Sequence, residues 1–232
     1  MAKKKIITKK SEAFLEKYLN NPSPTGFESG GQKMWLDYIS PYIDEHFVDT
    51  YGTVVGVINP EAKYKVVIEA HADEISWFVH YITKDGYIYL RRNGGSDHQI
   101  APSKRVNIHT KKGMVKAVFG WPAIHTRTAG TEKSPKLDNI FLDCGCASKE
   151  EVEALGIHVG CVVTYEDKFM ILNKNFYVGR ALDNRIGGFM IAEVARLLKE
   201  NKVKLPFGLY ITNSCLLYTS DAADDSLRVD PG

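Results

Sequence analysis

An apolar run that ends in a histidine constrains this chain more than any other feature. Residues 65–70 (KVVIEA) are rich in β-branched side chains, the pattern of a buried strand, and His71-Ala-Asp73-Glu74 follows directly. In open α/β sheets, ligands gather just beyond the carboxyl ends of strands. A neutral imidazole there binds a metal through one nitrogen while a carboxylate holds its other N–H. His71 and Asp73 supply both groups, although such a pair taken alone is more often a surface or capping pair.

A second motif, GRALDNR at residues 179–185, opens a helix far downstream. From Asp183 to about Glu200 the spacing of apolar residues is helical. Asp183 then lies at the amino end, where the helix dipole and free N–H groups favour a carboxylate. An N-cap and a metal ligand are both consistent with that position, and the pairing with His71 favours the ligand. The residues expected on one apolar face are Ile186, Met190, Val194 and Leu197.

Three motifs in this order and spacing resemble one known family. They are SPTGFE at residues 23–28, HADEI at residues 71–75 and GRALDNRIGG at residues 179–188. The chain resembles the cytosolic dinuclear-metal aminopeptidases, which include glutamyl and deblocking aminopeptidases and the tetrahedral dodecameric peptidases. The resemblance runs from about Lys10 to Asn213. It implies an α/β/α zinc-peptidase-like domain with a mixed sheet, interrupted by a small β-rich insert.

The resemblance also implies a site and its metals. By it, His71 binds one of two divalent ions, zinc or cobalt, Asp73 is the catalytic-site carboxylate that orients His71, and Asp183 bridges both ions. In related dinuclear peptidases a cis peptide joins the residues at the positions of Asp183 and Asn184. A glutamate general base and a further metal ligand would follow the apolar strand that ends near Thr212, and this sequence lacks them.

The function expected from the resemblance is hydrolysis of N-terminal residues from peptides. Two alternatives stay open: another hydrolase of the same metal class, such as a deacylase, a carboxypeptidase or a polysaccharide-cleaving relative, or an assembly module without catalysis. The implied partners are peptide substrates and further copies of the chain, in a homo-oligomer from dimer to dodecamer. The preferred substrate side chain and the identity of the metal are not specified by the sequence.

The chain changes character between the two ligand motifs. Short strands alternate with turns and lack crossover helices, which is typical of a small barrel or sandwich. The expected organisation is an α/β domain made of residues 1–76 and 167–213, with a β-rich insert at residues 77–166. In the resembled family such an insert mediates subunit contacts, and its polar loop at residues 126–136 is expected to contribute to assembly.

Residues 214–232 are interpreted as a non-native tail. The string that begins Cys215-Leu-Leu-Tyr-Thr-Ser matches a reading-frame translation of a transposase adaptor used in sequencing libraries. The sequence is therefore expected to be a truncated gene product without hydrolytic activity. Because the missing glutamates would follow Thr212 directly, only His71 and Asp183 remain as metal ligands.

Charge and cysteine content exclude several other classes. The net charge is +2, and the lysines of the first ten residues form a basic leader instead of a nucleic-acid-binding face. No apolar run is long enough to span a membrane. Cys144, Cys146 and Cys161 are expected to be buried reduced thiols, which favours the cytoplasm. The loop histidines His98 and His125 are interpreted as structural, although either is placed where it could approach the metal site.

Overall fold

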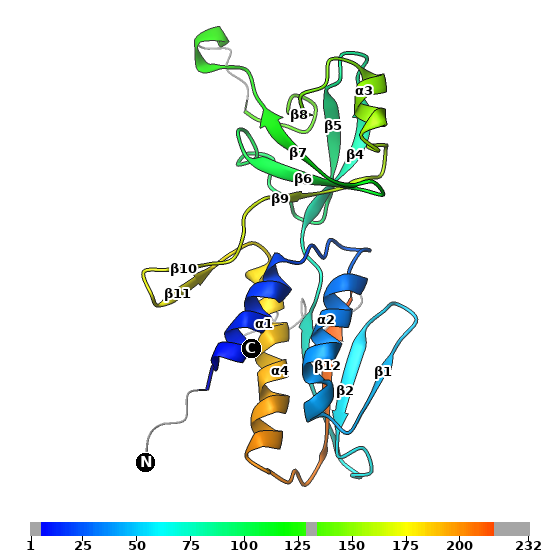
Figure 1. Cartoon of the computed structure of the whole chain (residues 1–232), viewed down its shortest axis with the longest axis vertical. Helices are drawn as coiled ribbons and strands as arrows, with labels where there is room; N and C mark the ends of the chain where they lie inside the picture. The colour runs from blue at the N-terminus through cyan, green and yellow to red at the C-terminus, as the bar shows by residue number, and fades with distance from the viewer. Residues whose placement is uncertain (1–5, 129–133, 216–232) are drawn as a thin grey trace, which may run out of the picture. The chain divides into compact units, whose positions relative to one another are not determined.

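The computed structural model describes residues 6–128 and 134–215. Outside the described residues lie Lys3, Lys4 and Lys5 of the basic leader, residues 129–133 of the polar loop and residues 216–232 of the adaptor-like tail. The chain divides into two compact units, each described by itself below (Figure 1). The α/β unit comprises Met1–Glu74 and Lys168–Gly232, and the barrel unit comprises Ile75–Asp167. The expected insert, residues 77–166, lies within the barrel unit.

A mixed four-stranded sheet forms the centre of the α/β unit. Its strand order is β1-β2-β12-β3, with β12 antiparallel to β2 and parallel to β3. The parallel register pairs Asn213 with Ala70 and Ser214 with His71, so the carboxyl ends of β12 and β3 lie together. The strands are β1 (Glu45–Val48), β2 (Val54–Ile58), β3 (Lys65–His71) and β12 (Gly208–Ser214).

Helix α1 (Lys9–Asn20) begins earlier than the sequence pattern indicates. Its N-cap is Thr8, whose hydroxyl accepts from the backbone N–H of Ser11, while the Ser11 hydroxyl lies 3.3 Å from the Thr8 backbone nitrogen. From residue types alone, Ser11 is the expected N-cap of a helix over residues 11–19. That prediction is wrong for the cap, because Ser11 is the N3 member of a reciprocal capping box whose N-cap is Thr8. Helix α2 (Ser29–Ile39) continues into the 3-10 turn η1 (Ser40–Tyr42).

Helix α4 (Leu182–Glu200) turns a different face inward from the one that periodicity indicates. Of the predicted apolar stripe, Ile186 is partly buried against the core, but Met190 is 61% exposed and Val194 is 38% exposed. The buried positions include three charged residues, each with at least one hydrogen bond or ion pair inside the protein. A hydropathy pattern assigns such residues to solvent. The buried residues of α4 are Arg185, Gly188, Phe189, Ala192, Glu193, Ala195 and Arg196.

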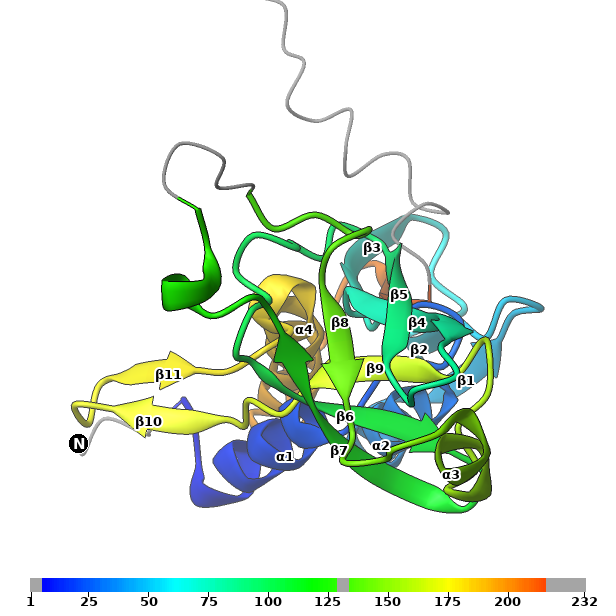
Figure 2. The same ribbon diagram turned by 90° about the horizontal axis from the view of Figure 1, so that it is seen from above.

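The core of the α/β unit lies between the sheet and helices α1, α2 and α4, which Figure 1 shows on one side of the strands. Phe14 stacks on Tyr38 with ring centroids 3.8 Å apart, and the indole N–H of Trp35 donates to the carbonyl of Gly188 at 2.8 Å. These contacts fix α1 and α2 against α4. A hairpin of β10 (Met170–Leu172) and β11 (Phe176–Val178) precedes α4 (Figure 2). Tyr177 of β11 donates its hydroxyl to Glu12 of α1 at 2.9 Å.

The barrel unit is closed, as the short-strand pattern predicted for a barrel or sandwich. Its strand order is β4-β5-β8-β7-β6-β9, and every pairing is antiparallel. The strands are β4 (Ser76–Ile82), β5 (Ile88–Asn93), β6 (Arg105–Thr110), β7 (Gly113–Gly120), β8 (Phe141–Asp143) and β9 (Val162–Tyr165). Two short helices accompany them, η2 (Ile124–Thr126) and α3 (Lys149–Ala154).

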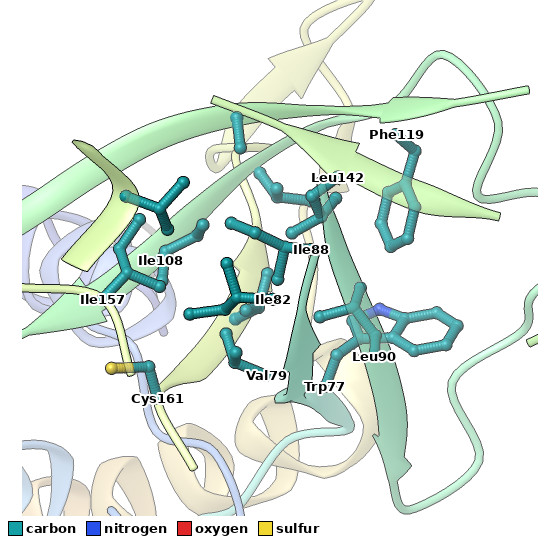
Figure 3. Close-up of a cluster of buried hydrophobic side chains, with 14 of the residues drawn as sticks. Trp77, Val79, Ile82, Ile88, Leu90, Ile108, Phe119, Leu142, Ile157 and Cys161 are labelled. Atoms are coloured by element: carbon teal, nitrogen blue, oxygen red, sulfur yellow. The ribbon is translucent and has the colours of Figure 1, made fainter. Parts of the chain in front are cut away.

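Inward-facing side chains of these strands fill the barrel interior (Figure 3). Trp77 and Phe119 meet edge to face with ring centroids 5.4 Å apart, and both are buried. Burial of a large aliphatic side chain stabilises the fold by about 1.5–3 kcal/mol. Cys161 belongs to this core, whereas Cys144 and Cys146 are only half-buried, so the expectation of buried thiols is wrong for those two.

The helices that the structure describes include none that is both long enough and apolar enough to cross a membrane.

Candidate metal centre

His71 is the last residue of β3, and the Asp73 carboxylate contacts one of its two ring nitrogens. Its Nδ1 lies 2.8 Å from Oδ1 of Asp73, and the two side chains are 13% and 8% exposed. The carboxylate accepts the Nδ1 proton in the neutral imidazole, which leaves the Nε2 lone pair available for a ligand. The His-x-Asp spacing therefore produces the arrangement that the sequence predicted.

Asp183 lies at the other side of this ring. Its Oδ1 is 3.5 Å from Nε2 of His71, and its side chain is 99% exposed. Ala181, in the left-handed region at φ 59°, begins the turn into α4, and Asp183 and Asn184 depart from helical backbone angles. Asp183 is not an N-cap, since Ala181 occupies that position without a side-chain cap bond. The peptide bond between Asp183 and Asn184 is cis, as expected.

The donor set fits a divalent ion. Zinc binds histidine nitrogen and carboxylate oxygen at about 2.0–2.2 Å, so two ligands of one ion lie roughly 3–3.5 Å apart, and the observed separation is 3.5 Å. The outer-shell carboxylate on Nδ1 is also the usual companion of a metal-binding histidine. Within residues 6–128 and 134–215, no group of three or more His, Cys, Asp or Glu side chains is arranged to hold a metal. The described site is thus a half-site with two donors.

The electrostatics of the half-site favour a positive charge. Burial lowers the pKa of His71, but the hydrogen bond and charge of Asp73, followed by the charge of Asp183, raise it more, and the net pKa lies above the ordinary value. The same two carboxylates that attract a proton attract a metal cation. A metal bound at His71 Nε2 would therefore have to compete with a proton for that nitrogen.

Two residues of the site were missed by sequence reasoning. Glu74 is buried, accepts the backbone N–H of Ser23 at 2.7 Å, and pairs with Arg180 at 3.4 Å. Glu74 belongs to the first ligand motif and Arg180 to the second, so a buried ion pair joins the two motifs beside the half-site. Membership in the motifs was the available signal, but the motifs alone do not indicate which charged residues meet.

The loop histidines of the sequence analysis both belong to the barrel unit. His98 lies on the wall of a cavity of about 690 Å³ formed by residues of that unit, together with His80 and Asp138. Its Nδ1 is buried and has no hydrogen-bond partner among the described residues. His125 lies in the short helix η2.

The α/β unit carries a His-x-Asp strand end beside the aspartate of α4, and a closed barrel is inserted between the two motifs. The sequence model of one family, described as M42 glutamyl aminopeptidase, matches residues 52–215. The chain belongs to this family. The resemblance inferred from three short motifs is thereby confirmed.

Individual relatives agree with this assignment. The lysyl aminopeptidase of Pyrococcus furiosus is 28% identical over 194 residues, which cover 82% of this chain and 56% of that protein. The TET aminopeptidase of a marine sediment archaeon of the Thaumarchaeota superposes with a TM-score of 0.84 at 28% identity, over 88% of this chain and 57% of that one. The TET1 peptidase of Pyrococcus horikoshii gives 0.76 at 23% identity, over 88% and 60%. The chain thus spans somewhat more than half the length of these relatives.

Proposed function

We propose that the protein acts as a metal-dependent aminopeptidase that removes N-terminal residues from peptides through a dinuclear centre. The observation that carries the proposal is the approach of His71 Nε2 to Asp183 Oδ1 at 3.5 Å, from two motifs more than a hundred residues apart. Asp73 supports it by occupying the other nitrogen of the ring. Membership in the M42 glutamyl aminopeptidase family supports the reaction class.

Each residue of the half-site has a proposed role. His71 would bind one ion through Nε2, Asp73 orients the imidazole and raises its basicity, and the exposed carboxylate of Asp183 would serve as the shared ligand of the two ions. When bound, two divalent ions, zinc or cobalt, would activate water near neutral pH and polarise the scissile carbonyl. Further ligands and a general base are required, and the register that pairs Ser214 with His71 indicates that residues following β12 would supply them. We therefore propose that the 232-residue chain by itself is hydrolytically inactive.

The proposed setting of the enzyme is a homo-oligomer in the cytoplasm. The TET1 peptidase of Pyrococcus horikoshii can assemble into a tetrahedron or a large octahedral shell. By analogy, the barrel unit would carry subunit contacts, with the polar loop at residues 126–136 contributing. Free cysteines are consistent with a reducing compartment. Peptides are the proposed substrates, and neither nucleic acid nor a membrane is a proposed partner.

The role of the half-site is tested by replacing its two donors in a protein extended after Thr212 with a glutamate-containing family segment. His71→Ala and Asp183→Asn are each expected to abolish zinc- or cobalt-dependent release of nitroaniline from aminoacyl-nitroanilides and to weaken metal binding in calorimetry. Matched controls are His80→Ala, an exposed histidine of the barrel unit, and Asp37→Asn, whose side chain is 64% exposed and pairs with Lys33 on the surface. Unchanged metal binding in His71→Ala would contradict the proposal, and exclusive cleavage of N-acyl amino acids would favour a deacylase.

The assembly role is tested by light scattering on the same extended protein. Deleting residues 126–136 is expected to reduce the oligomer mass by at least half, while shortening the hairpin turn between β10 and β11 serves as a control deletion in the α/β unit. An unchanged mass after the loop deletion would remove the assembly role of that loop.

A further inference from the structure

We propose that Thr25 is a positioning residue of the metal half-site. Its hydroxyl holds the Asp73 carboxylate in the orientation that directs Nε2 of His71 toward the metal position. Asp73 lies between the two residues, with one oxygen bound to each. The inference rests on the proposed function for its consequence in catalysis, but its structural content concerns this chain alone.

The backbone brings Thr25 to Asp73. After α1 the chain runs alongside the residues that follow β3, with an isolated parallel bridge between Pro24 and Glu74. The N–H of Glu74 donates to the carbonyl of Ser23 at 2.9 Å, and the N–H of Thr25 donates to the carbonyl of Glu74 at 3.3 Å. Pro24 has no N–H to contribute, so these two bonds on either side of it define the register. The register places the Thr25 side chain beside Asp73.

The Asp73 carboxylate is thereby shared between two partners. Thr25 Oγ1 donates to Oδ2 of Asp73 at 2.7 Å, while Oδ1 lies 2.8 Å from His71 Nδ1. The terminal torsion of an aspartate is broad, so one hydrogen bond alone leaves the carboxylate plane free to turn. Two directional bonds, one to each oxygen, fix the plane. Because the Asp73 side chain is only 8% exposed, water is poorly placed to replace the hydroxyl.

The segment that carries Thr25 is itself anchored to both ligand motifs. Glu74, from the first motif, accepts the N–H of Ser23 at 2.7 Å. Arg180, from the second motif, donates to the carbonyls of Leu19 and Asn20 at 3.4 and 3.3 Å. The backbone that carries Thr25 is therefore fixed by hydrogen bonds to both ligand motifs.

A second arginine, Arg185, contacts the same segment of the chain. Arg185 is fully buried, donates to the carbonyl of Asn21 at 2.6 Å and lies 4.2 Å from the centroid of the Tyr18 ring. Arg185 follows Asp183 by two residues, so the anchor of the segment and the second metal donor share one stretch of chain. The segment at residues 19–25 therefore contacts both ligand motifs, the one that contains His71 and the one that contains Asp183.

Removing the hydroxyl should loosen the imidazole without removing a metal ligand. Outer-shell partners of metal-binding histidines typically contribute about 10- to 100-fold in metal affinity. Thr25→Val removes the hydroxyl at nearly constant volume, and Thr25→Ser restores it. We expect zinc affinity to fall by about 10- to 100-fold in the valine variant and to recover most of that loss in the serine variant. Thr110→Val, which removes a hydroxyl bonded locally to the carbonyl of Gly113 in the barrel unit, is the matched control.

The first experiment uses the 232-residue chain without metal. Nitrogen-15 correlation spectra of the His71 ring, recorded above its pKa, report which nitrogen carries the proton. The wild type, Thr25→Ser and Thr110→Val are expected to show a single tautomer, protonated at Nδ1. Thr25→Val is expected to show a mixture with several-fold more of the Nε2-protonated tautomer. Circular dichroism checks that each variant is folded. A folded Thr25→Val with the wild-type tautomer ratio would overturn the proposal.

The second experiment measures zinc affinity by calorimetry in the protein extended after Thr212. A loss of about 10- to 100-fold in Thr25→Val, rescued by serine, supports the positioning role, and unchanged affinity contradicts it. The two proposals remain distinguishable. If His71→Ala leaves zinc binding intact, the proposed function fails, while the tautomer ratio in the metal-free chain still decides the role of Thr25.

Discussion

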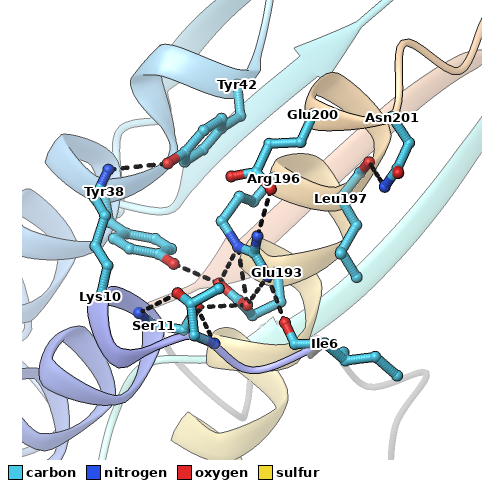
Figure 4. A network of polar contacts seen from close by, with 11 residues as sticks. Ile6, Lys10, Ser11, Tyr38, Tyr42, Glu193, Arg196, Leu197, Glu200 and Asn201 are labelled. Carbon is cyan, nitrogen blue, oxygen red and sulfur yellow. Dashed lines mark hydrogen bonds and ion pairs between the residues drawn. The ribbon is translucent and has the colours of Figure 1, made fainter. Parts of the chain in front are cut away.

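Replacing Arg196 with methionine is expected to destabilise the α/β unit by about 3–5 kcal/mol, the range for removing one partner of a buried ion pair. Arg196 and Glu193 have side chains only 2% and 6% exposed, one turn apart on α4. The guanidinium contacts the carboxylate through Nε at 3.1 and 3.0 Å and through a terminal nitrogen at 2.7 Å (Figure 4). The hydrogen bonds to Glu193 raise the pKa of Arg196, so its guanidinium stays charged.

The magnitude follows from what remains around Glu193 after the substitution. Ser11 still donates to the carboxylate at 2.8 Å, and the hydroxyl of Tyr38 still donates to its other oxygen. Two neutral donors do not offset a buried negative charge, and Arg196 also donates to the carbonyl of Ile6 at 2.5 Å, which loses its partner.

Two companion variants calibrate the result. Arg196 also pairs with Glu200 at 2.7 Å, but the Glu200 side chain is 42% exposed, so Glu200→Gln should cost less than about 1 kcal/mol. The double variant Glu193→Gln with Arg196→Met removes both charges together. It is expected to be more stable than Arg196→Met alone, because no unpaired charge stays buried.

Urea unfolding followed by far-ultraviolet circular dichroism is the assay. The signal reports mainly on the α/β unit, because α1, α2 and α4 belong to it and the barrel unit contributes only short helices. A loss below about 1 kcal/mol for Arg196→Met, or a loss equal to that of Glu200→Gln, would refute the reasoning that this pair acts as a buried charge.

Three further predictions concern other parts of the chain. Asp73→Asn should lower the pKa of His71 in an NMR titration; because Asp73 raises that pKa in the folded state, the stabilisation is present at acidic pH, and the wild type should lose it as the pH rises through the folded pKa. Phe119→Ala should destabilise the barrel unit by about 3–5 kcal/mol, whereas Tyr81→Ala, at a side chain 56% exposed, should change little. Burial and the neighbouring Cys146 raise the pKa of Cys144 to about 12, so Cys144 should react slowly with iodoacetamide at pH 8 in mass-spectrometric labelling, and fast modification would contradict that environment.

Much of the fold followed from local patterns. The residue types of β3 and of the barrel strands predicted these elements correctly as strands. The expectation that residues 65–70 form a buried strand is wrong, because β3 lies at the end of the described four-stranded sheet and Val67 is 61% exposed. The start of α1 was misplaced because Ser11 is a good N-cap by type, and only the backbone shows that Thr8 holds that position. A reciprocal capping box contains two cap-forming residues, and the pattern does not rank them.

The candidate site was predictable to the extent that its residues lie at element ends. His71 ends a strand and Asp183 begins a helix, and in α/β folds such ends meet at one edge of the sheet. The supporting contacts were not predictable in this way. Thr25, Arg180 and Arg185 are far from their partners in sequence, and a threonine or an arginine has no preferred partner that a spacing would reveal.

Helix α4 shows why the orientation of a helix could not be predicted from its apolar pattern. Periodicity identified the helix correctly but selected Met190 and Val194 as its inward face, and both are exposed. The inward face instead carries Arg185 at one end and the Glu193–Arg196 pair further along. Arg185 donates to the carbonyl of Asn21, Glu193 accepts from Ser11, and Arg196 donates to the carbonyl of Ile6. Because these bonds fix the rotation of α4 about its axis, they also determine where its first turn points. The position of Asp183 beside His71 therefore depends on buried charges that an apolar pattern assigns to solvent.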